Sequence, residues 1–431
     1  MQVTVETGEG LARRMTVELP PEQIEQEVEK RLRDVARNAR LPGFRPGKVP
    51  MRVLRQRFGD SVRGEVFGEL VQSSYPEAIA KEELRPAGMP EIEPSIDQAE
   101  RRYAYIAKFE VLPQIELKSL EGKTIKRPVA EVTDADVDDM ITRLREQRKT
   151  WVDVERPAAS GDRVMISFQG TLDGEPFPGG SAEERPLELG SGTMIPGFED
   201  QLVGASAGDE RVVEVTFSED YHAEKLAGKQ ARFDVQVSAV AEPQLPEVDA
   251  DFVRGFGVAD GDVDRFRADV RGNMERELKQ RIETRIKSQV MDALLEVNPV
   301  DLPGVLVREE IKALKSQTGQ AAGGGRFELP DELFAESATR RVALGLIVAE
   351  VAKQHAVSPD AERVRATVEE MAATYETPQE VIDYYYAEPQ RLSSVESLVM
   401  EEMVVERLLE QATVEEESTT FSALTEGGEA G

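Results

Sequence analysis

Apolar positions in the first part of the chain change from strand-like to helix-like spacing and back. Across residues 1–19 they alternate on both sides of a glycine-containing turn, and they alternate again across residues 101–111, so we expect a hairpin and a later strand. Between these segments, apolar residues recur at helical spacing in residues 24–39 and 53–71. This succession of strands and helices predicts an α+β domain that ends near Leu112.

The spacing changes again in the middle of the chain. Residues 113–149 begin as an extended stretch and continue as a charged helix, for which Thr133 is the expected N-cap and two aspartates occupy the first turn. We interpret this segment as a connector. From residue 150 to about residue 245, short alternating runs are separated by glycine-rich turns, which predicts a compact β domain with one short helix at residues 198–203.

The remainder of the chain, residues 246–431, is charged and has helical periodicity. One apolar stripe recurs mostly every four residues across positions 263–294, and similar stripes lie within residues 333–351 and 392–409. These stripes are narrow and contain charged residues, which leaves two interpretations open: splayed helices that expose apolar strips, or a closed bundle that buries them. Residues after Val414 are acidic and poor in apolar groups, so we expect a disordered acidic tail.

The composition excludes several kinds of chemistry. The 431 residues include no cysteine, so disulfides and thiol catalysis are excluded, and with only two distant histidines we expect no metal and no cofactor. No apolar run is long enough to cross a bilayer, and the first residues lack a secretory pattern, so we expect a cytoplasmic protein with no membrane partner. The net charge of -30 opposes nucleic-acid binding except where basic residues cluster.

Basic residues do cluster, around a loop of sequence GFRPGKVP at residues 43–50. Residues 30–57 contain ten Lys or Arg and one acid, a local charge of +9 within an acidic chain. A nucleotide-binding loop does not fit, because only three residues separate the two glycines and Val49 replaces the required Ser or Thr after Lys48. A plain connector between helices stays open as an alternative, but an exposed Phe44 indicates a surface that a partner buries.

This loop resembles the ribosome-docking loop of the bacterial trigger factor family, whose consensus runs Gly-Phe-Arg-x-Gly-Lys-x-Pro. The resemblance implies a chaperone that binds the large ribosomal subunit near the exit tunnel, through ribosomal protein and rRNA, and that receives nascent and unfolded polypeptides. It also allows a homodimer away from the ribosome. The residues that the resemblance assigns to ribosome binding are Gly43, Phe44, Arg45, Gly47 and Lys48.

The β domain contains the block LGSGTMIPGFE at residues 189–199, together with aromatic residues before and after it. These segments resemble the FKBP family of peptidyl-prolyl isomerases in its trigger-factor variant. By this resemblance, the catalytic proline pocket is lined by Phe168, Phe177, Ile195, Phe198, Tyr221 and Phe233. Spacing alone leaves open that these side chains only form the core of a small β domain. Relatives often carry an aromatic residue where this chain has Arg185, followed by Pro186, which leaves the isomerase rate open.

An apolar pocket of this kind suits isomerisation without acids or bases. Rotation of a peptide bond crosses a barrier of about 18–20 kcal/mol through a twisted amide, which has lost resonance and is less polar than either planar isomer. A site that binds the twisted form more tightly than the planar forms accelerates both directions, with no covalent step or proton transfer.

We therefore expect a multidomain α+β protein with an FKBP-like β domain and an all-α C-terminal domain with extended helical arms. The expected parts are a docking domain at 1–112, a connector at 113–149, an isomerase at 150–245 and a helical client-binding domain at 246–431. One rival is a simple isomerase whose other regions are spacers. Another is a coiled-coil scaffold, which is disfavoured because the stripes drift by fours and break at Gly and Pro.

Overall fold

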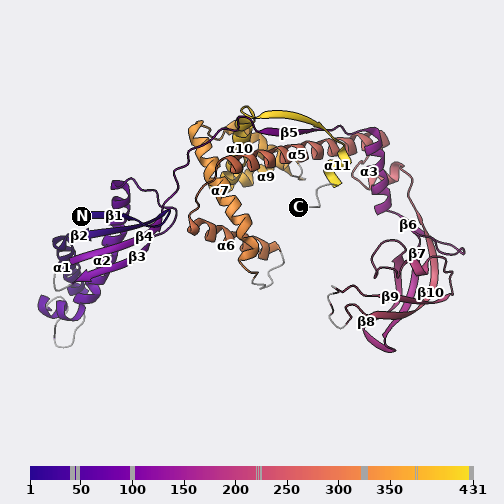
Figure 1. Ribbon diagram of the computed structural model, residues 1–431, viewed down its shortest axis with the longest axis horizontal. Coiled ribbons are helices and arrows are strands. Elements are labelled where there is room, and N and C mark those ends of the chain that lie inside the picture. The colour runs from indigo at the N-terminus through magenta and orange to yellow at the C-terminus, as the bar shows by residue number, and fades with distance from the viewer. Residues whose placement is uncertain are drawn as a thin grey trace. The chain divides into compact units, whose positions relative to one another are not determined.

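The structure is a computed structural model, and the residues that it describes are 1–38, 44, 49–97, 102–219, 221, 223, 226–321, 329–373, 375 and 377–426. The chain divides into two compact units. The first comprises Met1–Arg127 with Thr284–Glu416, and the second comprises Pro128–Glu283 with Glu417–Gly431. Figure 1 labels the elements along the chain.

The first unit begins with a four-stranded antiparallel sheet and two helices. The sheet has the order β1-β2-β4-β3. Its elements are β1 (Gln2–Thr7), β2 (Ala12–Leu19), β3 (Glu91–Asp97) and β4 (Arg102–Glu110), and the helices are α1 (Pro21–Asn38) and α2 (Met51–Lys81). The hairpin, the later strand and both helices are therefore confirmed, whereas β3 was not predicted.

One core joins this sheet to its helices. Alternation along β2 buries Met15 and Val17, and Tyr105 on β4 and Leu54 on α2 are also fully buried. The Tyr105 hydroxyl lies 3.0 Å from Ser74 Oγ on α2, so its polar end has a partner inside the core. Burial raises the pKa of the Tyr105 hydroxyl, against a smaller lowering by Ser74.

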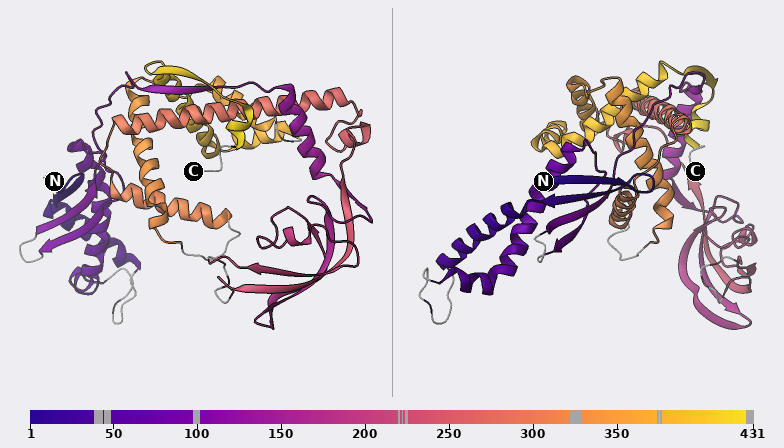
Figure 2. Two further views of the ribbon diagram at one scale, coloured as in Figure 1. Left: turned by 45° about the vertical axis from the view of Figure 1, so that its right-hand side comes forward. Right: turned by 60° about the vertical axis from the view of Figure 1, so that its left-hand side comes forward.

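The first unit also contains most of the C-terminal helices. A core forms where the last half of α5 (Val263–Val297) packs with α7 (Glu332–Gln354) and α10 (Pro389–Leu409). Around it lie α6 (Gly304–Ala321), α8 (Ala361–Ala372) and α9 (Pro378–Ala387). Figures 1 and 2 show α7 leaving the layer of α5 and α10 steeply, and α6 packs along α7.

The two interpretations of the helical stripes each hold for different helices. The stripe on α5 is buried or half-buried along its whole length, as a closed bundle requires. By contrast, among the described residues Leu314 is the one buried side chain of α6, and α9 has none. Leu333 on α7 and Tyr384 on α9 are exposed. The inner helices therefore form a core, whereas the outer helices leave apolar surface uncovered.

The second unit contains the predicted β domain. Its antiparallel sheet has the order β6-β10-β7-β8, and β9 pairs with an earlier part of β10 on the side opposite β7. The two views in Figure 2 show that this sheet is strongly twisted and curved. Its strands are β6 (Thr150–Asp153), β7 (Arg163–Leu172), β8 (Glu175–Glu188), β9 (Glu210–Thr216) and β10 (Gln230–Gln244), and its short 3₁₀ helix is η1 (Asp200–Leu202).

Two outer strands of these sheets contain proline within the described part of the chain. Pro94 lies in β3, which pairs with β4 alone, and Pro186 lies in β8, which pairs with β7 alone. A proline has no N–H for the ladder, so it is best tolerated in an outer strand or near a strand end, as Pro243 is at the end of β10.

A second core of this unit surrounds the first half of α5. It includes residues from α3 (Asp134–Gln147) and α4 (Ala250–Arg254). The predicted start of α3 is confirmed, because Thr133 and Asp136 form a capping box in which Thr133 Oγ1 accepts from the Asp136 N–H and the Asp136 carboxylate accepts from the Thr133 N–H.

The expectation of disorder after Val414 is wrong for residues 415–418 and 421–426. Strand β11 (Thr413–Ser418) pairs with β5 (Thr124–Val129), and α11 (Phe421–Glu426) follows it. Phe421 is buried in the core of α5, α3 and α4, Leu424 packs half-buried against the same core, and the pairing of β11 with β5 adds to the docking. The last residues, 427–431, lie outside the described part of the chain.

Replacing Phe421 by Ala should release this segment. Loss of a buried phenyl group costs about 3–5 kcal/mol where the site cannot collapse. We expect faster amide hydrogen exchange in β11, α11 and the first half of α5, measured by mass spectrometry on the full chain. Ser422→Ala is the matched control, since Ser422 is exposed and, within the described residues, its Oγ has one hydrogen-bond partner, Thr420 Oγ1. Unchanged exchange in the Phe421 variant would contradict the docking.

Candidate functional site

Four phenylalanine side chains meet on the inner face of the β domain. Phe168 on β7 and Phe233 on β10 point to the same face, since they lie in register beside Val235 and Gly170 respectively. Phe198 precedes η1 and packs edge-on against both, with ring centroids 5.9 Å from Phe168 and 5.3 Å from Phe233. Phe177 from β8 lies 5.9 Å from Phe233, also edge-on.

The six residues assigned to the pocket by resemblance all belong to one cluster. Phe168, Phe198 and Phe233 are buried, and Phe198 has no exposed surface. Phe177, Ile195 and Tyr221 are half-buried and pack against that core. Three of the six are thus core side chains, and the other three keep part of their apolar surface exposed. The core interpretation therefore holds for Phe168, Phe198 and Phe233.

Tyr221 reaches the cluster through a neighbour. Its ring centroid lies 4.6 Å from that of Phe217, which follows β9, and Phe217 in turn packs edge-on against Phe177 at 6.1 Å. This chain of rings holds Tyr221 beside Phe177 although the two residues lie far apart in sequence. His222, for which we expected no catalytic proton role, lies outside the described residues.

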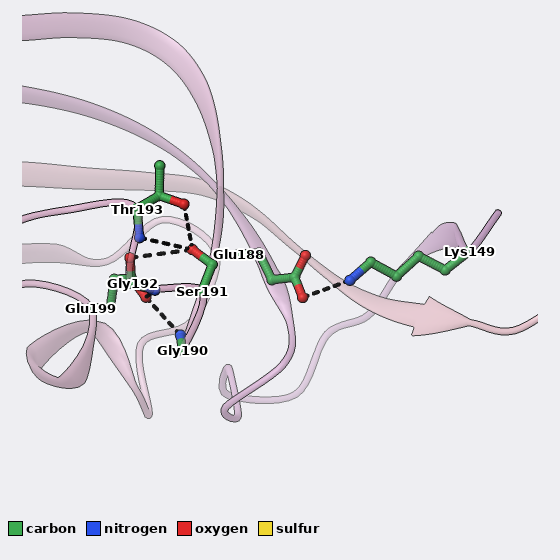
Figure 3. Close-up of polar contacts among 7 residues, drawn as sticks. All are labelled: Lys149, Glu188, Gly190, Ser191, Gly192, Thr193 and Glu199. Atoms are coloured by element: carbon green, nitrogen blue, oxygen red, sulfur yellow. Dashed lines mark hydrogen bonds and ion pairs between the residues drawn. The ribbon is translucent and has the colours of Figure 1, made fainter. Parts of the chain in front are cut away.

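Glu199 holds the loop that carries Ile195, a role that was not predicted from the motif. Its carboxylate accepts hydrogen bonds from the backbone N–H groups of Gly190 (2.8 Å), Gly192 (3.1 Å) and Met194 (3.0 Å), and from Ser191 Oγ (3.3 Å). Figure 3 shows the Gly190 and Ser191 contacts, with the carboxylate inside the turn of the loop. One side chain therefore fixes the backbone immediately before Ile195.

The protonation state of Glu199 follows from these contacts. Its side chain is 7% exposed, and burial alone would raise the pKa of its carboxyl group. The three backbone N–H groups and Ser191 outweigh burial, so the pKa lies below the ordinary value and the group is ionised at neutral pH. An ionised carboxylate whose oxygens already accept four hydrogen bonds cannot serve as a general acid, which fits chemistry without proton transfer.

Two glycines let the aromatic rings approach the sheet. A Cβ atom on Gly170 would lie 2.5 Å from Phe233 Cε1, and one on Gly180 would lie 2.8 Å from Phe177 Cε2. Any larger residue at these positions would displace the rings, so the two glycines fix the positions of Phe233 and Phe177 in the cluster. A glycine inside an alternating strand pattern was the sequence signal for Gly170, since it often marks close approach of another group.

The departures from the family pattern lie on the outer strand of the sheet. Arg185 and Pro186 are exposed on β8, in register with Ile166 and Met165. Next to them, Leu187 is buried, and the Glu188 carboxylate forms an ion pair with Lys149 Nζ at 2.6 Å (Figure 3). Arg185 therefore adds no aromatic surface to the cluster.

The basic loop is described at one position of its predicted site. Phe44 is 40% exposed, an unusual value for a phenylalanine. Gly43, Arg45, Gly47 and Lys48 lie outside the described residues. After the loop, Val49 is buried in the core of the first domain and Pro50 precedes the first residue of α2.

The described residues were also compared with the requirements of metal and membrane sites. In the described ranges, no group of three or more His, Cys, Asp or Glu is placed to hold a metal ion. No helix in those ranges is long and apolar enough to span a bilayer.

Three family models match successive parts of the chain. Family models match residues 1–144 (bacterial trigger factor protein, TF), 154–238 (FKBP-type peptidyl-prolyl cis-trans isomerase) and 262–410 (bacterial trigger factor protein C-terminus). The chain is 50% identical over 432 residues to the trigger factor of Stutzerimonas stutzeri, covering 100% of this chain and 99% of the relative. It is 48% identical to that of Alcanivorax borkumensis, covering 98% and 97%.

A solved structure shares the fold. It is described as "Promiscuous Substrate Recognition in Folding and Assembly Activities of the Trigger Factor Chaperone" and is 18% identical, with a TM-score of 0.51 over 95% of this chain and 100% of that one.

Proposed function

The chain belongs to the bacterial trigger factor family, and on this premise we propose that it docks beside the exit tunnel of the large ribosomal subunit and receives nascent polypeptides there. It is a trigger factor chaperone with an FKBP-type peptidyl-prolyl isomerase domain. The fold class expected from the sequence is confirmed, with an N-terminal α+β domain, an FKBP-like β domain and a helical C-terminal domain. The proposal concerns the partners and residues through which these domains act.

The exposed ring of Phe44 carries the docking proposal. It lies in a segment of charge +9, so a partner can bury the ring while its anionic groups face the cations. Gly43 and Gly47 would permit the turns of the loop, and Arg45 and Lys48 would contact ribosomal carboxylates and rRNA phosphates. Such a partner places the protein in the cytoplasm, with a homodimer as a further state away from the ribosome.

Replacing Phe44, Arg45 and Lys48 together by Ala should reduce ribosome binding at least about tenfold, because aromatic and arginine anchors dominate interface energies. The measurement is co-sedimentation of the full chain with purified ribosomes across a concentration series. Unchanged binding would sink the docking proposal.

A matched control changes one exposed apolar and two basic residues elsewhere on the same domain. Met89 is 94% exposed, and Arg102 and Lys108 lie on β4 in surface ion pairs with Glu18 and Glu93. The triple Ala variant of these three residues should sediment with ribosomes as the wild type does.

For the isomerase, we propose that the ligand proline rests on Phe177, Ile195 and Tyr221, above the buried floor of Phe168, Phe198 and Phe233. Support comes from the difference in burial between these two sets. The half-buried side chains can contact a substrate, whereas the floor fixes their positions. An apolar contact surface stabilises the twisted amide relative to its planar forms, so no catalytic acid is needed.

For client binding, we propose the outer helices of the C-terminal region. Leu333, Tyr384 and Tyr386 are each at least 47% exposed, and α9 buries none of its described side chains. Apolar surface of this kind, interspersed with charge, holds unfolded segments weakly. The functional division that we propose is docking at 1–112, a connector at 113–149, isomerisation at 150–245 and client holding at 246–431.

A further inference from the structure

The basic segment of the first domain separates into two parts that differ in their neighbours. On α1, acids outnumber cations by five to four, and each cation has an acidic partner. The pairs are Lys30–Glu27 (3.0 Å), Arg31–Glu69, Arg33–Glu29 (2.8 Å) and Arg37–Asp34 (3.4 Å). The positive charge of α1 is therefore largely offset within the domain.

The start of α2 is different. Residues 51–59 contain Arg52, Arg55 and Arg57 and no acid. All three arginines are exposed, and none has an ion pair or side-chain hydrogen bond with any residue that the structure describes. The net charge of +3 over these two turns is thus uncompensated.

Their position in the helix makes this charge less favourable still. The N-terminal turn of a helix carries the positive end of the helix dipole and usually contains acids, whereas α2 has none there. Three cations at that end repel both one another and the dipole. An anion bound at this place would relieve the repulsion, so the arrangement is electrostatically suited to a negatively charged partner.

The spacing of the three arginines shows on which sides of α2 they lie. Leu54 is buried in the domain core and Phe58 is half-buried against it, so they define the inner side of the helix. At 100° per residue, Arg52 and Arg55 lie on one flank of that inner side and Arg57 lies on the other. The cations therefore line both flanks of the first two turns.

We propose that Arg52, Arg55 and Arg57 bind the sugar-phosphate backbone of RNA, as a second contact beside the GFRPGKVP loop that precedes them. The inference rests on the proposed ribosome docking, for which it names the chemical partner of α2. A protein partner would need an apolar centre for its binding energy, but Val53 is half-buried and the other exposed residue, Gln56, is polar. Phosphates need charge alone, and guanidinium groups bind them in bidentate geometry.

The test compares two full-length variants with the same change of charge. One carries Arg52→Gln, Arg55→Gln and Arg57→Gln, and the matched control carries Lys30→Gln, Arg33→Gln and Arg37→Gln on α1. Binding of each chain to a fluorescently labelled RNA duplex of arbitrary sequence is measured by anisotropy between about 50 and 200 mM salt. Binding to polyglutamate is measured in parallel, as the probe for an acidic protein partner.

We expect the wild-type chain to bind the duplex at low salt and the α2 variant to bind about tenfold more weakly. Its slope of log affinity against log salt should fall by about 2–3, since three phosphate contacts are lost. The α1 control should change the affinity less than about twofold, because its cations are already paired. No RNA binding by the wild type, equal loss in both variants, or loss of polyglutamate binding alone would overturn the proposal.

A third variant separates this inference from the docking proposal itself. Phe44→Ala should lower ribosome binding and leave binding to the free RNA duplex unchanged, because its ring contributes no charge. If Phe44→Ala leaves ribosome binding intact while the α2 variant still loses RNA binding, docking through the loop fails and the RNA contact stands.

Discussion

Replacing Phe198 by Ala should unfold the floor of the isomerase and abolish its activity. The side chain has no exposed surface and contacts both Phe168 and Phe233, so its loss leaves a cavity that costs about 3–5 kcal/mol. Amides of β7 and β10 should then exchange at least about a hundredfold faster, because every 1.4 kcal/mol is a factor of ten. Hydrogen exchange on the full chain measures this locally, which a multidomain melting curve cannot.

A second variant separates catalysis from folding. Tyr221→Ala removes a half-buried ring at the edge of the cluster, so isomerisation of a proline-containing peptide should slow while exchange in β7 and β10 stays near the wild-type rate. If Tyr221→Ala left the isomerase rate unchanged, Tyr221 would not belong to the ligand surface.

The Phe198→Ala variant also tests the rival in which the protein is only an isomerase. Protection of an unfolding client from aggregation should survive Phe198→Ala, because the proposed client surface lies on α6, α7 and α9. Loss of protection in that variant would assign client holding to the β domain instead.

Replacing Glu199 by Gln should destabilise the β domain by about 2–4 kcal/mol at neutral pH. Three backbone N–H groups and one hydroxyl lose a charged acceptor, and hydrogen bonds to charged groups contribute about 1.5–3 kcal/mol each before compensation. The amide NH₂ of Gln would also face donors. Exchange of the Gly190, Gly192 and Met194 amides should therefore rise, and the isomerase rate should fall as Ile195 loses its fixed position.

The pH dependence of this effect has a defined sign. The pKa of Glu199 is lowered in the folded protein, so its stabilising contribution is present above the unfolded-state value of about 4.3 and is lost as the pH falls through the folded value. The stability difference between wild type and Glu199→Gln should be constant near neutral pH and shrink below about pH 4.

Glu183→Gln provides the control for Glu199, since Glu183 is exposed on the neighbouring strand β8 and has no hydrogen bond or ion pair among the described residues. Its stability should follow that of the wild type at every pH. A Glu199 variant that behaved in the same way would show that the carboxylate does not hold the loop.

Much of the fold could be predicted from the periodic spacing of apolar residues and from local capping residues. The buried faces of β2, β4 and α5, and the Thr133 cap of α3, were readable because each is set by residues close in sequence. Strand β3 was missed, since its pattern around Pro94 is mostly exposed and does not alternate clearly. The order of the C-terminal segment was also missed, because composition averages over a segment that docks through few apolar side chains, Phe421 and Leu424.

The residues of the aromatic cluster could be predicted from the sequence, but their burial and packing within it could not. The motif named the aromatic residues, whereas no spacing distinguishes a buried floor such as Phe198 from half-buried neighbours such as Tyr221. Glu199 lay inside the motif, yet its role depends on three N–H groups that converge only when the loop folds around them. The sequence likewise did not separate α1, whose cations are ion-paired, from the start of α2, whose arginines are not paired with any described residue. That difference depends on which side chains lie near each cation in the folded domain.

The prolines of β3 and β8 bear on whether this chaperone aggregates with its unfolded clients. A chaperone is exposed to many unfolded segments. Such segments can add as strands to an open sheet edge, because its unpaired N–H and C=O groups act as a template. Proline discourages strand addition at a sheet edge because it lacks the backbone N–H, and β3 and β8 each contain it. We therefore expect these two edges to resist pairing with strands of an unfolded client.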